Sequence, residues 1–387
     1  MNILIVYQYF GTHNSAWSTR CYEFAKRWVK AGHKVTVLTS PYDKSDITKS
    51  TNIDGINVIC SRFKQSNQDP FYLRIIKFLA FTILSTWYAL FSKYDTLICS
   101  SGPITVGVSG IVAKLFRRKR VIFEVRDLWP RGAIELGYIK FKPLIKLLYW
   151  FEKSCYKHSD LIIALSPDMQ ADIIKRFPNL QVECIPNASD TIFSEPVNNH
   201  NFQTFKQPYF VYTGSLGVMD DCIQIIEGIK CYNAQYTSPV DFYFAGKGVQ
   251  LNEMQALVTQ YQLKNVHFLG SLPKREIVPL IQNAFACIVC FKAINVLQSS
   301  SPNKLFDAFA ASKPVLQNTS GWIKSLNLEY PFGYTWQAGQ PENFAEGVFN
   351  MLNSPQYLQW SINAKQLAEN DFSRDILSNK YLTLLNA

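Results

Sequence analysis

Short apolar runs alternate with segments of helical periodicity along most of the chain, at the spacing typical of β-α-β units. In the first half, strands are predicted where apolar runs end in turn residues, at 3–7, 35–38, 58–60, 96–99, 121–125 and 161–165. Residues 18–31 place Tyr22, Ala25 and Trp28 on one helical face and predict a helix between the first two strands. This alternation predicts a doubly wound parallel sheet, whose ligand crevice lies beyond the carboxyl ends of the strands.

A second series of the same kind begins after a polar stretch at residues 194–208, which has no apolar periodicity. Strands are then predicted at 209–213, 241–245, 266–269, 286–291 and 314–317. The chain has 387 residues, too many for one compact core. We therefore expect an α/β protein with two Rossmann-like domains, residues 1–187 and 188–370. The sequence pattern of residues 371–387 predicts a C-terminal helix, which we expect to cross back to the first domain.

Composition narrows the class of protein. Hydrophobic residues make up 48% of the chain and charged residues 18%, which excludes a disordered chain. The formal net charge of +10 favours phosphate-bearing ligands, anionic membrane surfaces or nucleic acid, without choosing among them. Nine cysteines show no disulfide-like spacing, and the one close pair, Cys287 and Cys290, lies in a buried-strand pattern. We expect reduced thiols rather than a zinc site, and no signal peptide.

The most apolar segment of the chain is residues 71–92, and its part at 78–92 has no charge before Lys93. This uncharged run is shorter than the roughly 20 residues that span a bilayer. Two interpretations remain, a helix buried on its sheet or a helix lying in a membrane interface. The segment alone favours burial, whereas the basic residues at 117–120 favour the interface.

Two segments of the first domain carry candidate chemistry at strand ends. Residues 8–17 form a long polar loop between the first strand and the first helix, where a parallel sheet places its ligands. The loop lacks G-x-G-x-x-G, so a nicotinamide cofactor is not indicated. Glu124, Arg126 and Asp127 end another predicted strand, and we expect charged side chains at that position to face a ligand.

Three segments of the second domain have the composition of a phosphate site. Gly214 and Gly217 lie between a strand and a helix, where the backbone can approach a ligand closely. The turn at 246–248 has the same character. In residues 301–307, Pro302 suits a first helical turn, Lys304 can reach a diphosphate and Asp307 can accept two hydrogen bonds from a ribose diol.

An ordered set of short motifs runs over almost the whole chain. They are Tyr-Phe-Gly-Thr…Trp-Ser-Thr-Arg at 9–20, Arg-Asp-Leu-Trp-Pro at 126–130, Ile-Ile-Ala-Leu-Ser-Pro at 162–167, Ile-Pro-Asn at 185–187, Thr-Gly-Ser-Leu-Gly at 213–217, Phe-Leu-Gly-Ser-Leu-Pro at 268–273 and Pro-Asn-Lys-Leu-Phe-Asp at 302–307. In this order they resemble the retaining GT-B glycosyltransferases of family four, in the branch that extends bacterial surface polysaccharides such as O-antigen and capsule.

The resemblance implies a GT-B fold, two Rossmann-like domains facing across a cleft, with the acceptor on the first domain and a nucleotide sugar on the second. It implies a UDP-sugar as co-substrate, with an N-acetylhexosamine or deoxy-hexosamine to transfer, and no further cofactor. The acceptor would be a polyprenyl-diphosphate-linked sugar or a glycan. The enzyme would then lie in the cytoplasm, peripherally associated with the anionic inner face of the cell membrane. No Asp-x-Asp motif occurs, so we expect no metal.

The resemblance also assigns residues to roles. Lys304 would hold the diphosphate, Asp307 the ribose and Leu272 the base through its backbone, while Arg126 and Asp127 would face the sugar and the acceptor. The catalytic set is Asp127, Arg126 and Lys304. The donor-binding set is Gly214, Ser215, Leu216, Gly217, Lys247, Leu272, Ser301, Asn303, Lys304, Leu305 and Asp307. The acceptor-binding set is Phe10, Gly11, Thr12, His13, Asn14, Ser15 and Trp17.

The sequence departs from the family pattern at the Glu-x7-Glu element. Asp307 matches the second acid with one methylene fewer, and the first acid is replaced by Ser299, which leaves residues 299–301 as candidate hydroxyl substitutes. Gly-Asp-Gly is replaced by Gly-Lys-Gly at 246–248, which adds a cation near the donor.

Three other functions compete with glycosyl transfer. A nucleotide-sugar epimerase shares the GT-B fold, but the apolar segment at 71–92 speaks against a soluble epimerase. A non-catalytic partner subunit would tolerate the lost first acid, although Lys304 and Asp307 are retained. Nucleic-acid binding rests on net charge alone, because no recognition motif occurs.

Overall fold

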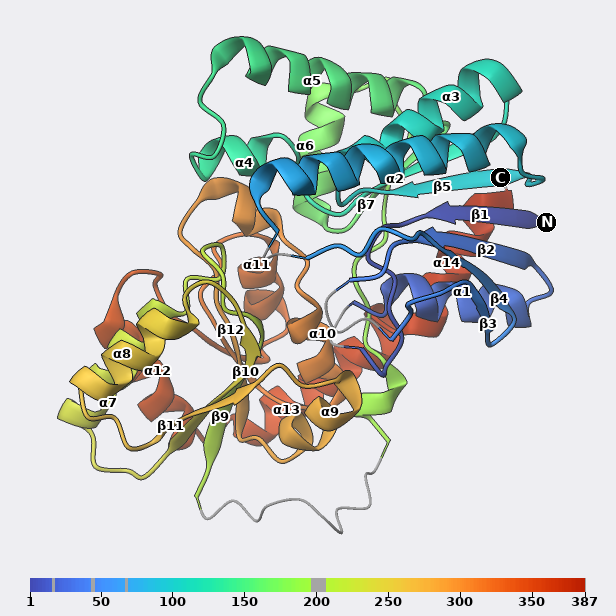
Figure 1. The fold of residues 1–387 in the computed structure, drawn as a ribbon. Helices are drawn as coiled ribbons and strands as arrows, with labels where there is room; N and C mark the ends of the chain where they lie inside the picture. Colours follow the sequence, from blue (N-terminus) through green and yellow to red (C-terminus); the bar gives the residue numbers. More distant parts are fainter. Residues whose placement is uncertain (16–17, 43–45, 67–68, 196–206, 387) are drawn as a thin grey trace. The chain divides into compact units, whose positions relative to one another are not determined.

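The computed structural model describes residues 1–15, 18–42, 46–66, 69–195 and 207–386. It contains two units, drawn in Figure 1. Unit 1 comprises Met1–Pro186 and Asp375–Ala387, and unit 2 comprises Asn187–Arg374. Each unit holds one α/β sheet, as the alternating sequence pattern predicts.

Unit 1 is built on an eight-stranded sheet with the strand order β3-β4-β2-β1-β5-β6-β7-β8. The strands are β1 (Asn2–Val6), β2 (Lys34–Thr39), β3 (Thr51–Ile53), β4 (Ile56–Cys60), β5 (Thr96–Ser100), β6 (Arg120–Val125), β7 (Leu161–Ala164) and β8 (Val182–Cys184). All neighbours pair in parallel except β3 and β4, which form an antiparallel pair. The six strands predicted from sequence are confirmed. Strands β3 and β8 were not predicted, because each has three residues and too little apolar pattern.

Helices cover both faces of this sheet. They are α1 (Arg20–Lys30), α2 (Phe71–Phe91), α3 (Gly107–Arg117), α4 (Arg131–Glu135), α5 (Lys142–Lys157), α6 (Pro167–Arg176) and α14 (Arg374–Asn386). Helices α2, α3 and α5 lie on one face, and α1 and α14 on the other (Figure 1). Right-handed crossovers require this division, because the chain moves one way along the sheet from β1 to β2 and the other way from β5 to β6.

The C-terminal helix α14 packs on α1 through aromatic side chains. Trp28 is 2% exposed and stacks on Phe24, and the Tyr381 ring meets Trp28 edge-on at 5.2 Å between ring centroids. Arg27 Nε donates to Asp375 Oδ1 at 2.5 Å. Residues 375–386 thus complete the core of unit 1, although they follow unit 2 in sequence.

Unit 2 contains a six-stranded, fully parallel sheet with the order β11-β10-β9-β12-β13-β14. The strands are β9 (Tyr209–Ser215), β10 (Asp241–Lys247), β11 (Val266–Gly270), β12 (Ala286–Val289), β13 (Val315–Gln317) and β14 (Gly333–Thr335). The longer helices are α7 (Ile223–Gln235), α8 (Leu251–Gln260), α9 (Lys274–Gln282), α10 (Asn303–Ala310), α11 (Trp322–Glu329), α12 (Pro341–Leu352) and α13 (Tyr357–Gln366). The five predicted strands are confirmed, and β14 was missed because it is short and only half-buried.

Candidate functional site

Strand order locates one candidate site in each unit. In unit 1 the chain winds in opposite directions on either side of β1 and β5, and in unit 2 it does so on either side of β9 and β12. Loops leaving the carboxyl ends of such neighbouring strands separate and leave room for a ligand. The polar segment at 8–17 follows β1 and the glycines at 214–217 end β9, while the segments at 124–127 and 246–248 lie at the ends of the neighbouring strands β6 and β10.

In unit 2, the two glycine segments at the carboxyl ends of β9 and β10 pair through their main chains, with Gly214 opposite Gly246. Gly214 has φ +134°, a conformation that favours glycine. A Cβ on Gly246 would lie 1.8 Å from the Gly214 carbonyl oxygen, and one on Gly248 would lie 2.1 Å from the Leu216 carbonyl oxygen. Glycine is therefore required at 246 and 248 by close approach of main chains. In the sequence, each glycine segment alone is a weak indication of a phosphate site. In the structure, the two segments lie against each other.

Lys304, in the first turn of α10, lies against the first of these glycine turns. Its Nζ donates to Tyr212 Oη at 2.5 Å and to Asp220 Oδ1 at 2.9 Å, and it lies 4.0 Å from the centroid of the Tyr212 ring. A Cβ on Gly214 would come within 3.3 Å of Lys304 Cε. The structure thus places a buried cation at the switch point of the second sheet, beside backbone that only glycine could form. The sequence pattern predicts Lys304 as a ligand of the diphosphate, but it gives no signal for Tyr212 or Asp220.

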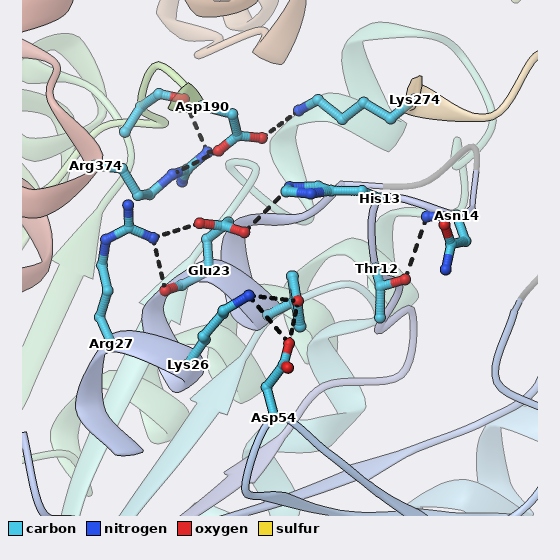
Figure 2. A network of polar contacts seen from close by, with 12 residues as sticks. Thr12, His13, Asn14, Glu23, Lys26, Arg27, Asp54, Asp190, Lys274 and Arg374 are labelled. Atoms are coloured by element: carbon cyan, nitrogen blue, oxygen red, sulfur yellow. Dashed lines mark hydrogen bonds and ion pairs between the residues drawn. The ribbon is translucent and has the colours of Figure 1, made fainter. Parts of the chain in front are cut away.

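Asp307 lies one turn further along α10, in a buried network of charges. Its Oδ1 is 3.1 Å from Lys274 Nζ, and Lys274 also pairs with Asp190. Asp190 in turn accepts from Arg374 Nε at 2.9 Å (Figure 2). Burial raises the pKa of Asp307 to about 6, opposed by Lys274 and reinforced by Asp190. A carboxyl group with this pKa is largely ionised at neutral pH and can accept hydrogen bonds from a diol.

The remaining predicted donor residues differ in what their side chains can contact. Leu216 and Leu305 are buried in the core, so a ligand could reach them only through the main chain. Ser301 Oγ accepts from the Asn187 backbone N–H at 3.2 Å, and Ser299 Oγ donates to the Val296 carbonyl at 2.7 Å. Five of these remaining donor residues are at least partly exposed: Ser215, Gly217, Lys247, Leu272 and Asn303.

In unit 1, the loop after β1 forms a compact turn rather than an extended arm. Thr12 pairs with Asp46, Ser15 Oγ donates to the Thr12 carbonyl at 2.9 Å, and the Asn14 backbone N–H donates to Thr12 Oγ1 at 3.2 Å. His13 Nε2 lies 3.1 Å from Glu23 Oε1, and Glu23 also pairs with Arg27, as Figure 2 shows.

Of the other predicted acceptor residues, Phe10 and Gly11 are buried in unit 1. Trp17 lies outside the described residues.

Arg126 follows β6 and is fixed from several sides. Its backbone N–H donates to Ser101 Oγ at 2.9 Å, its Nη2 donates to Ser18 Oγ at 3.2 Å, and its guanidinium lies 4.8 Å from the centroid of the Tyr7 ring. Burial alone would lower the pKa of Arg126, but the nearby Tyr7 and Glu124 outweigh burial and raise this pKa above its usual value. Asp127 beside it is exposed. The strand end therefore presents a fixed cation next to a carboxylate.

Glu124 corrects an expectation, since its side chain belongs to the core rather than to a ligand surface. It is 5% exposed, accepts from Arg20 Nε at 3.0 Å and from Ser100 Oγ at 2.7 Å. Burial alone would raise the pKa of Glu124, but Arg20 and Arg126 outweigh it and hold the pKa below its usual value. Arg20 also donates to the Ile185 carbonyl at 2.9 Å. Glu124 and Arg20 thus connect β6 and α1 to the segment that follows β8, at Ile185.

Unit 2 contains a cavity of about 380 Å³, which borders the charge network of Asp307 at Asp190 and Arg374. Its lining includes Asp190, Gln282, Lys313, Lys365 and Arg374. None of the predicted donor residues lines it. We therefore do not assign the donor to this cavity.

Comparisons with known proteins assign the class. The family model "Glycosyltransferase Family 4" matches residues 18–193, and the model "Glycosyl transferases group 1" matches residues 198–367. One match falls on each half of the chain, and together they cover most of it. With two parallel-sheet α/β units, they identify the chain as a GT-B glycosyltransferase.

Solved structures with the same fold match over the full chain. Sucrose-phosphate synthase from Thermosynechococcus elongatus matches at TM-score 0.73 and 15% identity, covering 100% of this chain and 98% of that one. HepE (Alr3699) from Anabaena, in complex with UDP and glucose, matches at TM-score 0.71 and 15% identity, covering 100% and 99%. WaaG, a glycosyltransferase involved in lipopolysaccharide biosynthesis, matches at TM-score 0.69 and 15% identity, covering 99% of each chain. No curated protein sequence matches the chain.

Proposed function

We propose that this chain transfers a sugar from a UDP-sugar to a lipid-linked or glycan acceptor, with retention of configuration, in surface-polysaccharide biosynthesis. The observation that carries the proposal is the placement of Lys304 at the switch point of the second sheet, against the paired glycine turns. The chemistry of that place suits a diphosphate, because it combines a cation, close backbone approach and a helix start.

UDP or a UDP-sugar is bound in several solved structures of the same fold. HepE from Anabaena is described in complex with UDP and with UDP-glucose, and the TarM structure from S. aureus also holds UDP. We therefore assign the second unit of this chain to a UDP-sugar. An N-acetylhexosamine or deoxy-hexosamine is the sugar we expect, from the resemblance of the motifs to the surface-polysaccharide branch.

In the proposed reaction, the bond between the sugar's anomeric carbon and the β-phosphate oxygen breaks, and the acceptor hydroxyl oxygen forms a bond to that carbon from the same face. The leaving diphosphate gains negative charge, which Lys304 and the amides at the start of α10 stabilise. The β-phosphate oxygen takes the acceptor proton. This scheme needs no protein nucleophile, and Lys304 supplies the charge that a metal ion would otherwise supply.

Two further groups have assigned roles. Asp307, with a pKa near 6, accepts hydrogen bonds from the ribose hydroxyls once it is ionised. Arg126 is held rigidly by Ser101, Ser18 and Tyr7, and it orients the sugar while Asp127 beside it binds the acceptor. The acceptor we propose is a polyprenyl-diphosphate-linked sugar in the cytoplasmic leaflet.

Donor screening tests the proposal. The purified full-length chain is incubated with a panel of UDP- and GDP-sugars, with and without a polyprenyl-diphosphate-linked acceptor, and nucleotide release and product mass are recorded. We expect UDP release that depends on acceptor, and a product heavier by one sugar with its anomeric configuration kept. Epimerised donor without transfer, or no turnover with any donor, would contradict the proposal. Lys304→Met should abolish this turnover, whereas the matched control Lys313→Met, which replaces another lysine of unit 2, should leave it unchanged.

A further inference from the structure

The outer face of α2 carries a continuous apolar stripe. Tyr72, Ile76, Leu79, Ile83, Trp87 and Phe91 are between 53% and 71% exposed and recur every three or four residues. The opposite face, with Phe81, Ser85 and Ala89, is buried. The sequence left open whether this helix is buried or interfacial. The structure shows that it is buried along one face and bare along the other.

A second exposed apolar surface lies on α5 and the turn before it. Tyr138, Phe141, Leu147 and Trp150 are between 56% and 68% exposed. Single exposed apolar residues are ordinary, but two exposed surfaces rich in aromatic side chains within one unit are unusual for a monomer.

These surfaces share one side of unit 1. Helix α2 packs on α3, where Ser109 Oγ donates to Ser85 Oγ at 2.7 Å, and α3 packs on α5. All three helices cover the same face of the sheet (Figure 1). At the end of α3, Leu115 and Phe116 are 57% and 76% exposed. We call the exposed apolar residues of α2, α3 and α5 the outer helical surface.

The exposed charged side chains of α5 are all positive. Lys140, Lys142, Lys146, Lys153 and Lys157 are exposed on or beside α5. The α2 sequence contains no acid, and the one acid of α5, Glu152, is buried and paired with Arg176.

The basic run at 117–120 contributes fewer free cations to the outer helical surface than its sequence suggests. Arg117 Nη1 donates to the Leu90 and Ser92 carbonyls at the end of α2, and Arg120 donates to the Leu384 carbonyl. Arg118 of this run is exposed. The free cations therefore come mainly from α5 rather than from residues 117–120.

Two alternatives explain the outer helical surface less well than a lipid surface does: α2 crossing a bilayer, and a second copy of the chain covering the surface. A helix of the length and hydropathy of α2 could cross a bilayer. However, β4 before it and β5 after it belong to the same sheet, and its inner face packs on α3. A second copy of the chain would bring lysines against lysines, because the surface has no exposed acids on α2 or α5 to pair with them.

We propose that the outer helical surface lies in the headgroup region of an anionic bilayer, with the aromatic and aliphatic side chains of α2 and α5 inserted and the α5 lysines against lipid phosphates. Basic helices with Trp and Leu on one face bind such interfaces by apolar burial and electrostatic attraction together. The surface lies outside the proposed catalytic residues, so attachment and sugar transfer can fail separately.

Vesicle binding of the full-length chain tests this proposal. Co-sedimentation is measured with vesicles of phosphatidylcholine alone and of phosphatidylcholine mixed with phosphatidylglycerol. Lys142→Gln/Lys146→Gln/Lys153→Gln should lower binding to the anionic vesicles on the order of a hundred-fold, since each cation near such a surface contributes roughly five-fold. The control replaces three exposed lysines of unit 2 (Lys264→Gln/Lys324→Gln/Lys365→Gln) and should change binding little.

The apolar part is tested separately. Ile83→Gln/Trp87→Gln/Trp150→Gln should lower binding to both vesicle types, whereas Val249→Gln/Leu328→Gln/Leu358→Gln, equally exposed on unit 2, should not. Lipids brominated on their acyl chains should quench tryptophan fluorescence, and Trp87→Phe/Trp150→Phe should remove most of that quenching.

Equal binding to both vesicle types, equal loss in the control variants, or dimerisation that the α2 variant abolishes would each overturn the proposal. Calorimetric titration of the same variants with UDP checks that unit 2 is intact. Loss of vesicle binding with unchanged UDP affinity supports the proposal whatever the outcome of the transfer assay.

Discussion

Replacing Lys304 with methionine should separate its part in folding from its part in donor binding. In the structure, Lys304 and Asp220 form an ion pair at 2.9 Å with both side chains about nine-tenths buried, at 11% and 12% exposed. Tyr212 lies 2.8 Å from the same Asp220 oxygen. Methionine keeps the length and apolar stem of lysine, so the variant removes the charge and leaves the packing nearly intact.

The expected magnitudes follow from these contacts. Breaking a fully buried pair by removing one partner costs about 3–5 kcal/mol. Because Tyr212 still faces Asp220, we expect about 2–3 kcal/mol for Lys304→Met. The double variant Asp220→Asn/Lys304→Met leaves no uncompensated charge, and its free energy of unfolding should return to within about 1 kcal/mol of the wild type. UDP affinity should fall by about 1.5–3 kcal/mol, roughly 10- to 150-fold, in both variants.

Denaturant unfolding and calorimetric titration with UDP measure the two quantities. Asp220→Asn alone should bind UDP as tightly as the wild type or more tightly, because the phosphate no longer competes with a carboxylate for Lys304. If the second substitution restores both stability and UDP affinity, the lysine acts only through folding. If UDP affinity is unchanged in Lys304→Met, the diphosphate lies elsewhere. Either result would refute the assignment.

Three further predictions concern other parts of the chain. Burial raises the pKa of Asp307 to about 6, so the protonated carboxyl favours folding, and this contribution to stability is lost as pH rises from about 4 through 6. Unfolding curves should therefore show that Asp307→Asn becomes more stable relative to the wild type over this range, by about 3 kcal/mol. Asp127→Ala should abolish sugar transfer and leave UDP affinity within about two-fold, as titration would show. Trp28→Ala should cost about 3–5 kcal/mol in denaturant unfolding, because it opens the contact between α1 and α14.

The strands could be predicted well from sequence because buried parallel strands are continuous apolar runs, as in β5 and β9. The missed strands β3, β8 and β14 have three residues each and are mostly half-buried or exposed, whereas β13, of the same length, is fully buried and apolar enough to be predicted. The strand order was not accessible in the same way. The switch points that locate the candidate sites depend on which strands pair, and pairing joins residues far apart in the chain.

The candidate site likewise combines features that local sequence predicts with features that depend on long-range contacts. Lys304 could be proposed from local sequence, since its spacing after Pro302 gives a helix start with a cation. Its partners could not, because Tyr212 and Asp220 are 92 and 84 positions away in the chain. The Glu124 side chain was expected to face a ligand and is instead in the core, because its partner Arg20 lies 104 positions away. Charge at a strand end does not reveal whether a buried opposite charge already pairs with it.

A crystal structure of the chain with UDP tests the central claim most directly. The account predicts the diphosphate within hydrogen-bonding distance of Lys304 Nζ, in contact with the backbone at Gly214, with the ribose hydroxyls at Asp307 and with the Lys304–Asp220 contact lengthened. UDP in the cavity lined by Lys313 and Lys365, or bound in unit 1, would contradict it.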